Sequence, residues 1–404
     1  MFKKVMIASS VLSMVSVLAL ADATVTPIDV KADTIKFIDN MVANQDKVGG
    51  WVVSDRVKKD DQERFRVTFT PLKNQAMKQK DMEDMEGLAF DNKIAYNKDS
   101  LKSTSTLSAI PTDVHLRKGE KKIVDDIIKD KVVEITTNYS AKDYKFDGRL
   151  KDINETIEGG TIVTKDIEFK GSYNPNDILA QDSSFFVKSI DLTPPQDKLK
   201  GEFVSIKDIK ISSNSQLDGA KLNLKTHISV ASVDAKVMNQ VTDVKNLTLD
   251  TTIANLDIKS YKELIVLIQD NPTNYIDDPK LFPLLTGLLT AEGISINIDN
   301  LSVDKLIVKN QDMGNGKITA KVSLKNDPNL AKMIAMNPLM ALSALQVEAN
   351  IELSQEMFNT LMKDKRAFIL GMLPQKKVGD MIVYKIDFKD GKLLINGKEL
   401  APPQ

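Results

Sequence analysis

The sequence predicts an α+β fold dominated by one long, twisted, antiparallel β-sheet of repeated hairpins, with a few helices packed on one face. The prediction rests on a six-residue phrase whose last three residues alternate apolar, polar and apolar, as in a half-buried strand. Successive copies begin 23, 19 and 38 residues apart. A spacing near 20 fits one up-and-down pair of strands, and 38 is twice 19. The copies are Thr164–Phe169, Val187–Leu192, Ile206–Ile211 and Val244–Leu249, with a variant at Ile298–Val303.

The phrase also predicts an irregularity inside the strands. In most copies the apolar residue at the first position has the opposite parity to those at the end. A bulge or kink at the polar pair between them would bring both sets onto one face. The segment Lys221–Val230 alternates similarly and places His227 on the polar face, where we interpret it as a solvated surface histidine.

Helices and strands are both predicted before the repeats. Apolar residues at spacings of three and four predict a helix over Ala32–Gln45, with Asp33 placed as a cap. Arg64–Pro71 alternates as a strand does, and Lys121–Asp130 has paired apolar residues at helical spacing. This part of the chain is therefore expected to be mixed.

Helices also interrupt the strands after the repeats. The patterns predict helices in Lys259–Pro272 and Asp278–Gly293, and a further helix capped by Ser354. The chain then closes on a hairpin that turns at Asp390 and Gly391. We divide the sequence into a signal peptide or anchor (1–23), an N-terminal helix with a mixed region (24–160), the repeated hairpins (161–258) and a C-terminal region (259–404).

The first residues indicate export. A basic start, Met1–Lys4, precedes a 17-residue apolar stretch, Val5–Ala21, and two small-x-small cleavage sites. This is the pattern of a secretory signal. We expect a periplasmic protein exported by the general secretory route. The alternative is an uncleaved anchor that holds the chain in the inner membrane, facing the periplasm, although the stretch is shorter than the ~20 residues a spanning helix needs.

Composition excludes several classes of function. The formal net charge is −1 and aromatic residues make up 5%, so neither a basic footprint nor a stacking platform for nucleic acid is present. The chain has no cysteine, which rules out disulfides, thiol nucleophiles and cysteine-ligated metals. The two histidines, His115 and His227, form no metal or triad motif. We predict no cofactor, no metal site and no catalytic residue.

Two apolar segments are the candidate binding residues. Asp278–Gly293 is apolar nearly all round, and Asn329–Leu345 is rich in methionine, which suits irregular contacts. Either both complete the core of the sheet, or they line a groove for an apolar ligand such as a lipid, or for an envelope protein. The groove residues would be Leu281, Phe282, Leu285, Leu288, Met333, Met336 and Met340.

A hydrolase is the alternative function. Acidic residues such as Asp60, Asp61, Asp125 and Asp126 could perform acid–base chemistry in the N-terminal part. Loop polarity explains such pairs better. Two buried carboxylates that converge in a cleft would favour the hydrolase, whereas a continuous apolar groove would favour the non-enzymatic binding protein that we predict.

One modification motif is present. Asn154 lies in an acceptor sequon completed by Thr156, with the acidic Asp152 two residues before it. Some bacteria glycosylate periplasmic proteins at this extended form of the sequon. Asn154 is therefore a candidate glycosylation site, although an ordinary polar loop is the favoured interpretation.

The closing segment is Tyr384–Leu400 (YKIDFKDGKLLINGKEL), and the segments before it include, in order, Gly293–Val303, Gly314–Pro328 and Asn337–Met362. This segment and this order resemble the YdgA-like family of bacterial envelope proteins, which carry a domain of unknown function. The resemblance covers roughly residues 245 to 400, and residues 24–140 depart from it. It implies an envelope protein without assigned catalytic residues. The repeated strand pairs are also similar to AsmA-like proteins, whose long sheets hold lipid in an apolar groove, at the level of the fold alone.

Overall fold

The computed structural model describes residues 29–43, 50–70, 86–110, 125, 128–129, 133–157, 160–174, 177–194, 200–270, 278–325, 330, 333, 336–337, 344–363, 368–389 and 391–400. The chain divides into two compact units, Met1–Lys200 and Gly201–Gln404, here called the N-terminal and C-terminal units. The division falls within the predicted hairpin region 161–258. The predicted antiparallel sheet of many hairpins with few helices is confirmed in the described residues.

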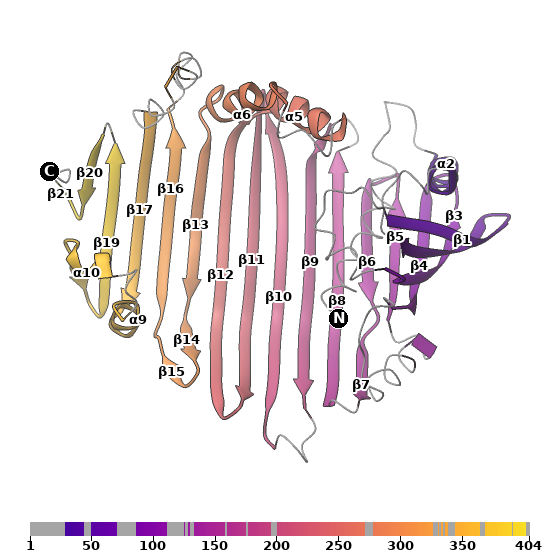
Figure 1. The fold of residues 1–404 in the computed structure, drawn as a ribbon, viewed down its shortest axis with the longest axis horizontal. Coiled ribbons are helices and arrows are strands. Elements are labelled where there is room, and N and C mark those ends of the chain that lie inside the picture. The colour runs from indigo at the N-terminus through magenta and orange to yellow at the C-terminus, as the bar shows by residue number, and fades with distance from the viewer. Residues whose placement is uncertain are drawn as a thin grey trace. The chain divides into compact units, whose positions relative to one another are not determined.

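In its described residues the N-terminal unit is a meander of antiparallel strands, with helix α2 packed against it (Figure 1). In space the strands follow the order β1, β2, β3, β4, β5, β6, β8, β9, and β7 pairs with β8 beyond the end of β6. The elements are α2 (Val30–Ala43), β1 (Gly50–Lys59), β2 (Gln62–Thr70), β3 (Ala89–Tyr96), β4 (Ser100–Ala109), β5 (Glu134–Ser140), β6 (Lys145–Leu150), β7 (Ile153–Ile157), β8 (Gly160–Asn174) and β9 (Asp177–Thr193).

Strands of the N-terminal unit have one buried face. Along β2 and β3 buried and exposed residues alternate almost without interruption. The buried side chains form two clusters, one containing Phe65 and Val67 with Val30 and Ile38 of α2, the other built around Phe90. The predicted N-terminal helix is present, but Asp29 rather than Asp33 accepts the amide of Ala32 at 3.0 Å and caps it.

The C-terminal unit is a second antiparallel meander, with longer strands. Its order in space is β10, β11, β12, β13, β16, β17, β19, β20, β21; β14 and β15 extend the lines of β13 and β16, and β18 flanks β19. The strands are β10 (Phe203–Asp218), β11 (Lys221–Val237), β12 (Gln240–Asp257), β13 (Ser295–Val303), β14 (Lys305–Val308), β15 (Gln311–Asp312), β16 (Gly316–Leu324), β17 (Leu345–Ser354), β18 (Lys376–Val378), β19 (Met381–Lys389), β20 (Lys392–Ile395) and β21 (Lys398–Glu399).

Helices of the C-terminal unit lie at strand ends (Figure 1). Those whose bounds are described are α5 (Ile258–Asp270), α6 (Leu281–Thr290), α9 (Gln355–Leu361) and α10 (Phe368–Met372). Both α5 and α6 contact β12, and α9 contacts β17 and β19. The predicted cap of α9 is confirmed, since the Ser354 hydroxyl accepts the amide of Met357 at 3.2 Å.

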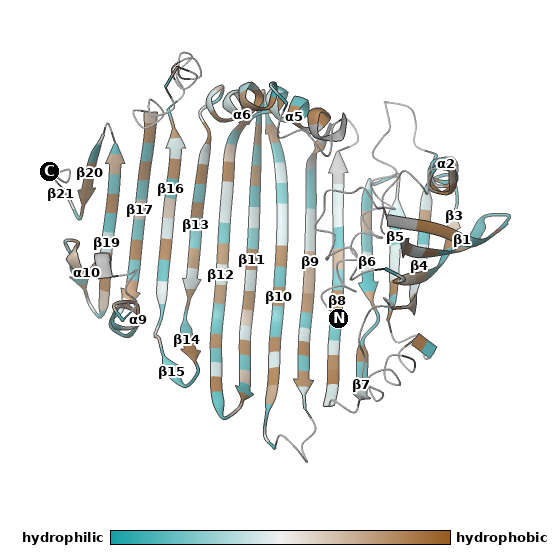
Figure 2. Cartoon of the chain, viewed as in Figure 1, coloured by the Kyte–Doolittle hydropathy of each residue, from teal (hydrophilic) through white to brown (hydrophobic). Residues whose placement is uncertain are grey.

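The predicted kink in the repeated phrase is present in three copies. Asp166, Asp208 and Asn246, the third residue of their phrases, have φ of 47°, 51° and 51°. Aspartate and asparagine enter this left-handed region more readily than other non-glycine residues. Each kink falls at the polar pair, between the first residue of the phrase and the alternating residues at its end. The alternation of apolar and polar residues therefore continues on the same face after the kink. Figure 2 shows the resulting bands of hydrophobic and hydrophilic residues along β10, β11 and β12.

The closing hairpin is held by one asparagine. The side-chain amide of Asn396 donates to the carbonyls of Pro374 (2.7 Å) and Val383 (3.0 Å), and its oxygen accepts the amide of Lys385 (2.9 Å). Asn396, directly after β20, therefore joins β19 to the segment that precedes β18. Beside it Tyr384 is fully buried and donates its hydroxyl to the carbonyl of Leu370 at 2.7 Å. The predicted β19–β20 hairpin is a packed end of the C-terminal unit.

Candidate functional site

Aliphatic side chains form continuous rows across the C-terminal sheet. Because opposite residues of paired strands lie on the same face, the register of β10 to β17 brings residues of distant phrases into line. One row consists of Ile211, Ile228, Leu249, Leu301, Ile318 and Ile351. A parallel row consists of Leu224, Ile253, Ile296, Val322 and Val347. We call these two rows the apolar face.

The apolar face is only half covered. None of its residues is buried, and Ile211, Val322 and Ile296 are the most exposed, Ile296 at 48%. Strands lie about 4.8 Å apart, so a row of six spans about 24 Å, and two rows four residues apart are separated by about 13 Å. An exposed aliphatic surface of this length is a recognised mark of an interaction site in soluble proteins.

Burial increases towards two margins of this face. Leu222 and Leu256, which are paired beyond the second row, are buried at the end of the sheet where α5 and α6 contact β12. At the other margin Tyr384, Leu353 and Phe358 form a packed cluster with partly buried residues near α9 and α10. The uncovered part therefore lies between two closed margins, on β10 to β17.

Helix α6 is oriented with its threonines inward and part of its hydrophobic surface outward. Thr286 and Thr290 are buried, and their hydroxyls donate to the carbonyls four residues earlier, at 2.8 Å each. Phe282, Leu285 and Leu289 are 55%, 37% and 39% exposed. Of the predicted groove residues on this helix, Phe282 and Leu285 are thus exposed, and Leu281 and Leu288 are partly buried. Their part in a groove stays a prediction.

The methionine-rich segment falls largely outside the described residues. Met333 is partly buried and Met336 is exposed, whereas Met340 lies outside the part of the chain that the structure describes. Whether these methionines share a surface with α6 is therefore a prediction that stays open. Asn154 is exposed on β7, paired with Val163 of β8, and its glycosylation likewise stays a prediction.

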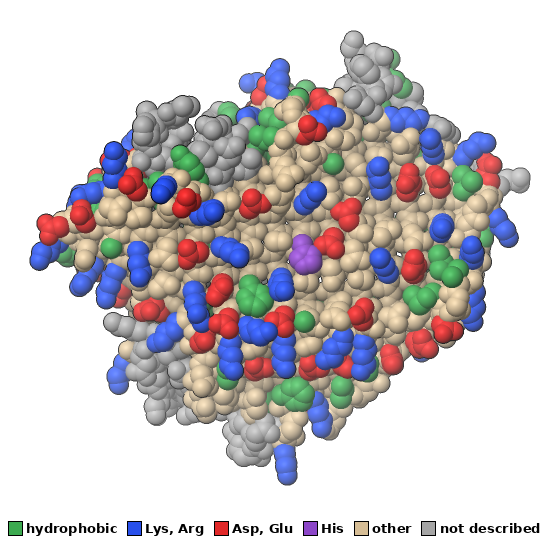
Figure 3. Space-filling model, turned by 180° about the vertical axis from the view of Figure 1, so that it is seen from behind, with side chains coloured by type: hydrophobic (Ala, Val, Ile, Leu, Met, Phe, Trp, Pro, Cys, Tyr) green, Lys and Arg blue, Asp and Glu red, His purple; other side chains and the backbone are tan. Residues whose placement is uncertain are grey.

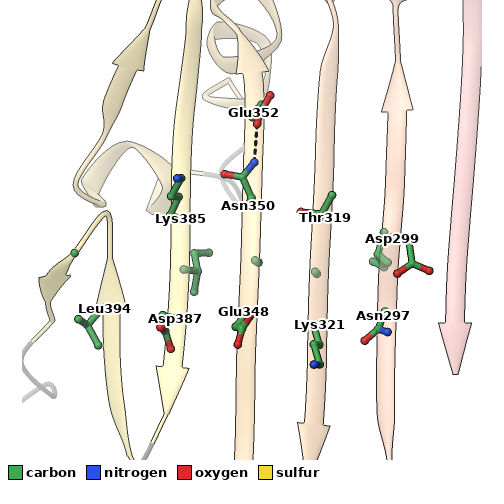
Figure 4. Close-up of a pocket in the computed structure, with 15 residues that line it drawn as sticks. Asn297, Asp299, Thr319, Lys321, Glu348, Asn350, Glu352, Lys385, Asp387 and Leu394 are labelled. Atoms are coloured by element: carbon green, nitrogen blue, oxygen red, sulfur yellow. Dashed lines mark hydrogen bonds between the residues drawn. The ribbon is translucent and has the colours of Figure 1, made fainter. Parts of the chain in front are cut away.

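The opposite face of the C-terminal sheet is polar. Figure 3 shows charged side chains of both signs around the histidine, with few hydrophobic side chains among them. An open hollow of ≈ 770 Å³ lies over β13, β16, β17 and β19 on this face (Figure 4). Its polar lining residues include Asn297, Asp299, Thr319, Lys321, Glu348, Asn350, Glu352, Lys385 and Asp387. Within it Asn350 donates to Glu352 at 2.6 Å.

His227 lies on this polar face as predicted, but it has partners that the sequence pattern did not reveal. Its Nδ1 is 2.6 Å from Oδ1 of Asp250, and its Nε2 is 3.1 Å from the hydroxyl of Ser229. This is the order of groups that activates a serine nucleophile. Ser229, however, is paired on both sides, with Lys210 and Thr248, so the sheet uses its backbone amide and offers no oxyanion hole there. We interpret the three residues as a polar cross-strand network.

Buried charge in the N-terminal unit is paired. Glu63 is the one fully buried carboxylate among the described residues. It accepts hydrogen bonds from Nε of Arg56 and, at 3.2 Å, from the hydroxyl of Tyr96. Arg56 also binds Asp39 of α2 at 2.5 Å. Burial, and then the charge of Glu63, raise the pKa of Tyr96 to about 12. This cluster ties α2 to the sheet, and it contains no second buried carboxylate of the kind that the hydrolase alternative requires.

Comparison with known proteins shows the family. The family model described as "Bacterial protein of unknown function (DUF945)" matches residues 66–403. The chain belongs to this family. The match extends past the closing hairpin, and it also includes most of residues 24–140, which depart from the sequence resemblance. No curated protein and no solved structure matches the chain.

Two findings, on membrane-spanning helices and on metal sites, apply to the described residues only. Within them no helix is long and apolar enough to cross a membrane. Nor does any cluster of three or more histidine, aspartate or glutamate side chains there suit a metal ion. Residues 1–23, the predicted signal or anchor, lie outside the described residues.

Proposed function

We propose that this protein is a non-enzymatic envelope protein whose C-terminal sheet holds the acyl chains of a lipid on its apolar face. The observation that carries the proposal is the pair of aliphatic rows, which cross β10 to β17 while their side chains stay half exposed. A folded domain gains stability by covering such rows. A bound ligand that covered them would supply the missing contacts.

Energetic magnitudes favour a lipid over a small apolar molecule. Each buried methylene contributes ~0.8 kcal/mol, so a chain of about ten methylenes gains about 8 kcal/mol. Association itself costs about 4–15 kcal/mol in lost freedom. Two such chains, which gain about 16 kcal/mol when they are fully covered, exceed this cost, whereas a short molecule does not. The rows contain no charged side chain, which also suits hydrocarbon.

Sequence features support the proposed location. The N-terminal residues have the pattern of a secretory signal, which supports a location of the folded units in the periplasm, or at the periplasmic side of the inner membrane if the signal is not cleaved. The likeness of the closing segment to YdgA-like proteins agrees with an envelope location. The analogy to AsmA-like proteins agrees with lipid as the ligand, at the level of fold.

The proposal is tested by mass spectrometry of lipids extracted from the purified protein. Ile296 and Val322 are directly paired and exposed, so replacing both with serine removes part of the apolar face with little effect on folding. Asn297 and Lys321 are the next pair along the same two strands and face the polar side. The Asn297→Ser/Lys321→Ser variant is therefore a matched control.

We expect the Ile296→Ser/Val322→Ser variant to retain several-fold less lipid than the wild type, and the control to retain the wild-type amount. Circular dichroism of each variant checks that the sheet is intact. A wild type that carries no lipid above the level of an unrelated purified protein would contradict the proposal. So would equal lipid in both variants.

A further inference from the structure

We infer that the outward stripe of α6, formed by Phe282, Leu285 and Leu289, is the surface through which the protein contacts a lipid layer. This inference rests on the proposed function, because it gives the lipid a route to the apolar face. The three residues are spaced by three and four, so they lie along one side of the helix. All three are exposed, and no charged residue interrupts Leu281–Thr290.

The orientation of α6 is built into its packing. A Cβ atom added to Gly287 would lie 2.7 Å from the hydroxyl oxygen of Ser260 on α5, so a leucine rotated into this position would collide with α5. The small residues Gly287 and Ser260 therefore fix which side of α6 faces inward. The same side carries Thr286 and Thr290, whose hydroxyls bind within the helix and need no other partner.

The chemistry of the stripe suits hydrocarbon better than a protein partner. Protein interfaces are usually anchored by arginine, tyrosine or tryptophan and by hydrogen bonds around the centre. The stripe has an aromatic ring and two aliphatic side chains, without a polar group between them. Lys280 at the start of the stripe and Lys259 next to Ser260 are exposed. Lysines beside a helix that lies in the membrane interface bind the anionic headgroups of lipids.

The stripe also lies near one end of the apolar face. Helix α6 contacts β12, and Leu256 at the end of that strand is buried there together with its partner Leu222. The next residues along the face, Leu224 and Ile253, are already half exposed. An acyl chain that leaves a lipid layer at α6 therefore meets the covered margin first and the apolar face directly after it.

Single-cysteine labelling tests this surface. The chain has no natural cysteine, so Leu285→Cys carries the only thiol and can be labelled with an environment-sensitive nitrobenzoxadiazole dye. Met238, at the β11–β12 turn, is 81% exposed and apolar, and Met238→Cys gives a matched control far along the strand from α5 and α6. Vesicles of phosphatidylethanolamine and phosphatidylglycerol are the probe. The readout is local, so an uncleaved N-terminal anchor does not mimic the signal.

We expect vesicles to raise the emission of the dye at Leu285 several-fold with a blue shift, and to leave the dye at Met238 unchanged. Quenching of the Leu285 signal by spin-labelled acyl chains would place the dye in hydrocarbon. No change at Leu285, or a change at Met238 alone, overturns the inference. Lipid extracted from the same samples tests the proposed function separately. Bound lipid without a signal at Leu285 contradicts the inference and leaves the proposed lipid binding intact. A signal at Leu285 without bound lipid supports the inference and contradicts the proposed lipid binding.

Discussion

The two units use the same strand pattern with opposite results. In the N-terminal unit, β2 and β3 bury nearly every second residue, because apolar side chains from several strands and from α2 meet in two clusters. In the C-terminal unit, β10 has no buried residue and β11 has one, although both alternate as clearly. Alternation therefore predicts that a strand has an apolar face, whereas tertiary contacts decide whether that face is buried in a core.

The units also differ in how they hold charge. The N-terminal unit buries Glu63 and compensates it with Arg56 and Tyr96. The C-terminal unit leaves its ion pairs more accessible to water: Lys305, whose side chain is 47% exposed, lies 2.6 Å from Asp243, whose side chain is 18% exposed, and lowers the pKa of that carboxyl group. Removing one member of an ion pair should therefore lower stability more in the N-terminal unit than in the C-terminal unit, since an unpaired charge is costly only where water is excluded.

The largest expected effect separates a core residue from a residue of the apolar face. Phe90 is fully buried, so Phe90→Ala should lower the free energy of unfolding by about 3–5 kcal/mol, as large-to-small core changes do. Ile296 is half exposed, and Ile296→Ala should cost about 1 kcal/mol or less. Urea denaturation followed by circular dichroism measures both. Equal costs would mean that the apolar face is covered in solution and would remove the difference between the units.

A second prediction uses pH to probe the closed unit. Because the pKa of Tyr96 is raised to about 12, the unfolded chain, with a tyrosine pKa near 10.0, releases this proton first. The contribution of Tyr96 to stability is complete below pH ~10 and falls as pH rises towards ~12, by about 2–3 kcal/mol in total. The wild type should therefore lose more stability than Tyr96→Phe between pH 9 and 11.5, measured by urea midpoints. Parallel curves for the two proteins would show that Tyr96 is not buried beside Glu63.

A third, smaller effect concerns the kinks that interrupt the strands. Asn246 has φ 51°, which glycine adopts freely and a β-branched residue adopts only with strain. Its side-chain amide also donates to Asp304 at 2.8 Å. We expect Asn246→Val to lower the melting temperature through about 1–3 kcal/mol of strain, and Asn246→Gly to cost about 1 kcal/mol, the value of one exposed hydrogen bond. If valine were tolerated as well as glycine, the strand would not need the left-handed residue.

Local rules were sufficient for much of the fold. The alternating phrases predicted the strands, and the mismatch of parity predicted the kinks later found at Asp208 and Asn246. The orientation of α6 was not predictable from hydropathy, which favours leucine inward. It depends on the close approach of Gly287 to Ser260, a contact between two helices that no single segment reveals. The contact of His227 with Asp250 was missed for the same reason, since Asp250 comes from the neighbouring strand.

The smallest expected effect is on the open polar face. Ser229, His227 and Asp250 have the spacing of a nucleophile, base and acid, so a fluorophosphonate probe is the sharpest test of whether the C-terminal unit is catalytic. We expect no labelling of Ser229 above that of a Ser229→Ala variant. The backbone amide of Ser229 is part of the sheet ladder and is not free to form an oxyanion hole. The side chains of His227 and Asp250 are 41% and 36% exposed, so water competes for the hydrogen bonds of the network. Labelling that disappears in both Ser229→Ala and His227→Ala would contradict the non-enzymatic proposal and would move the hydrolase alternative from the N-terminal unit to this face.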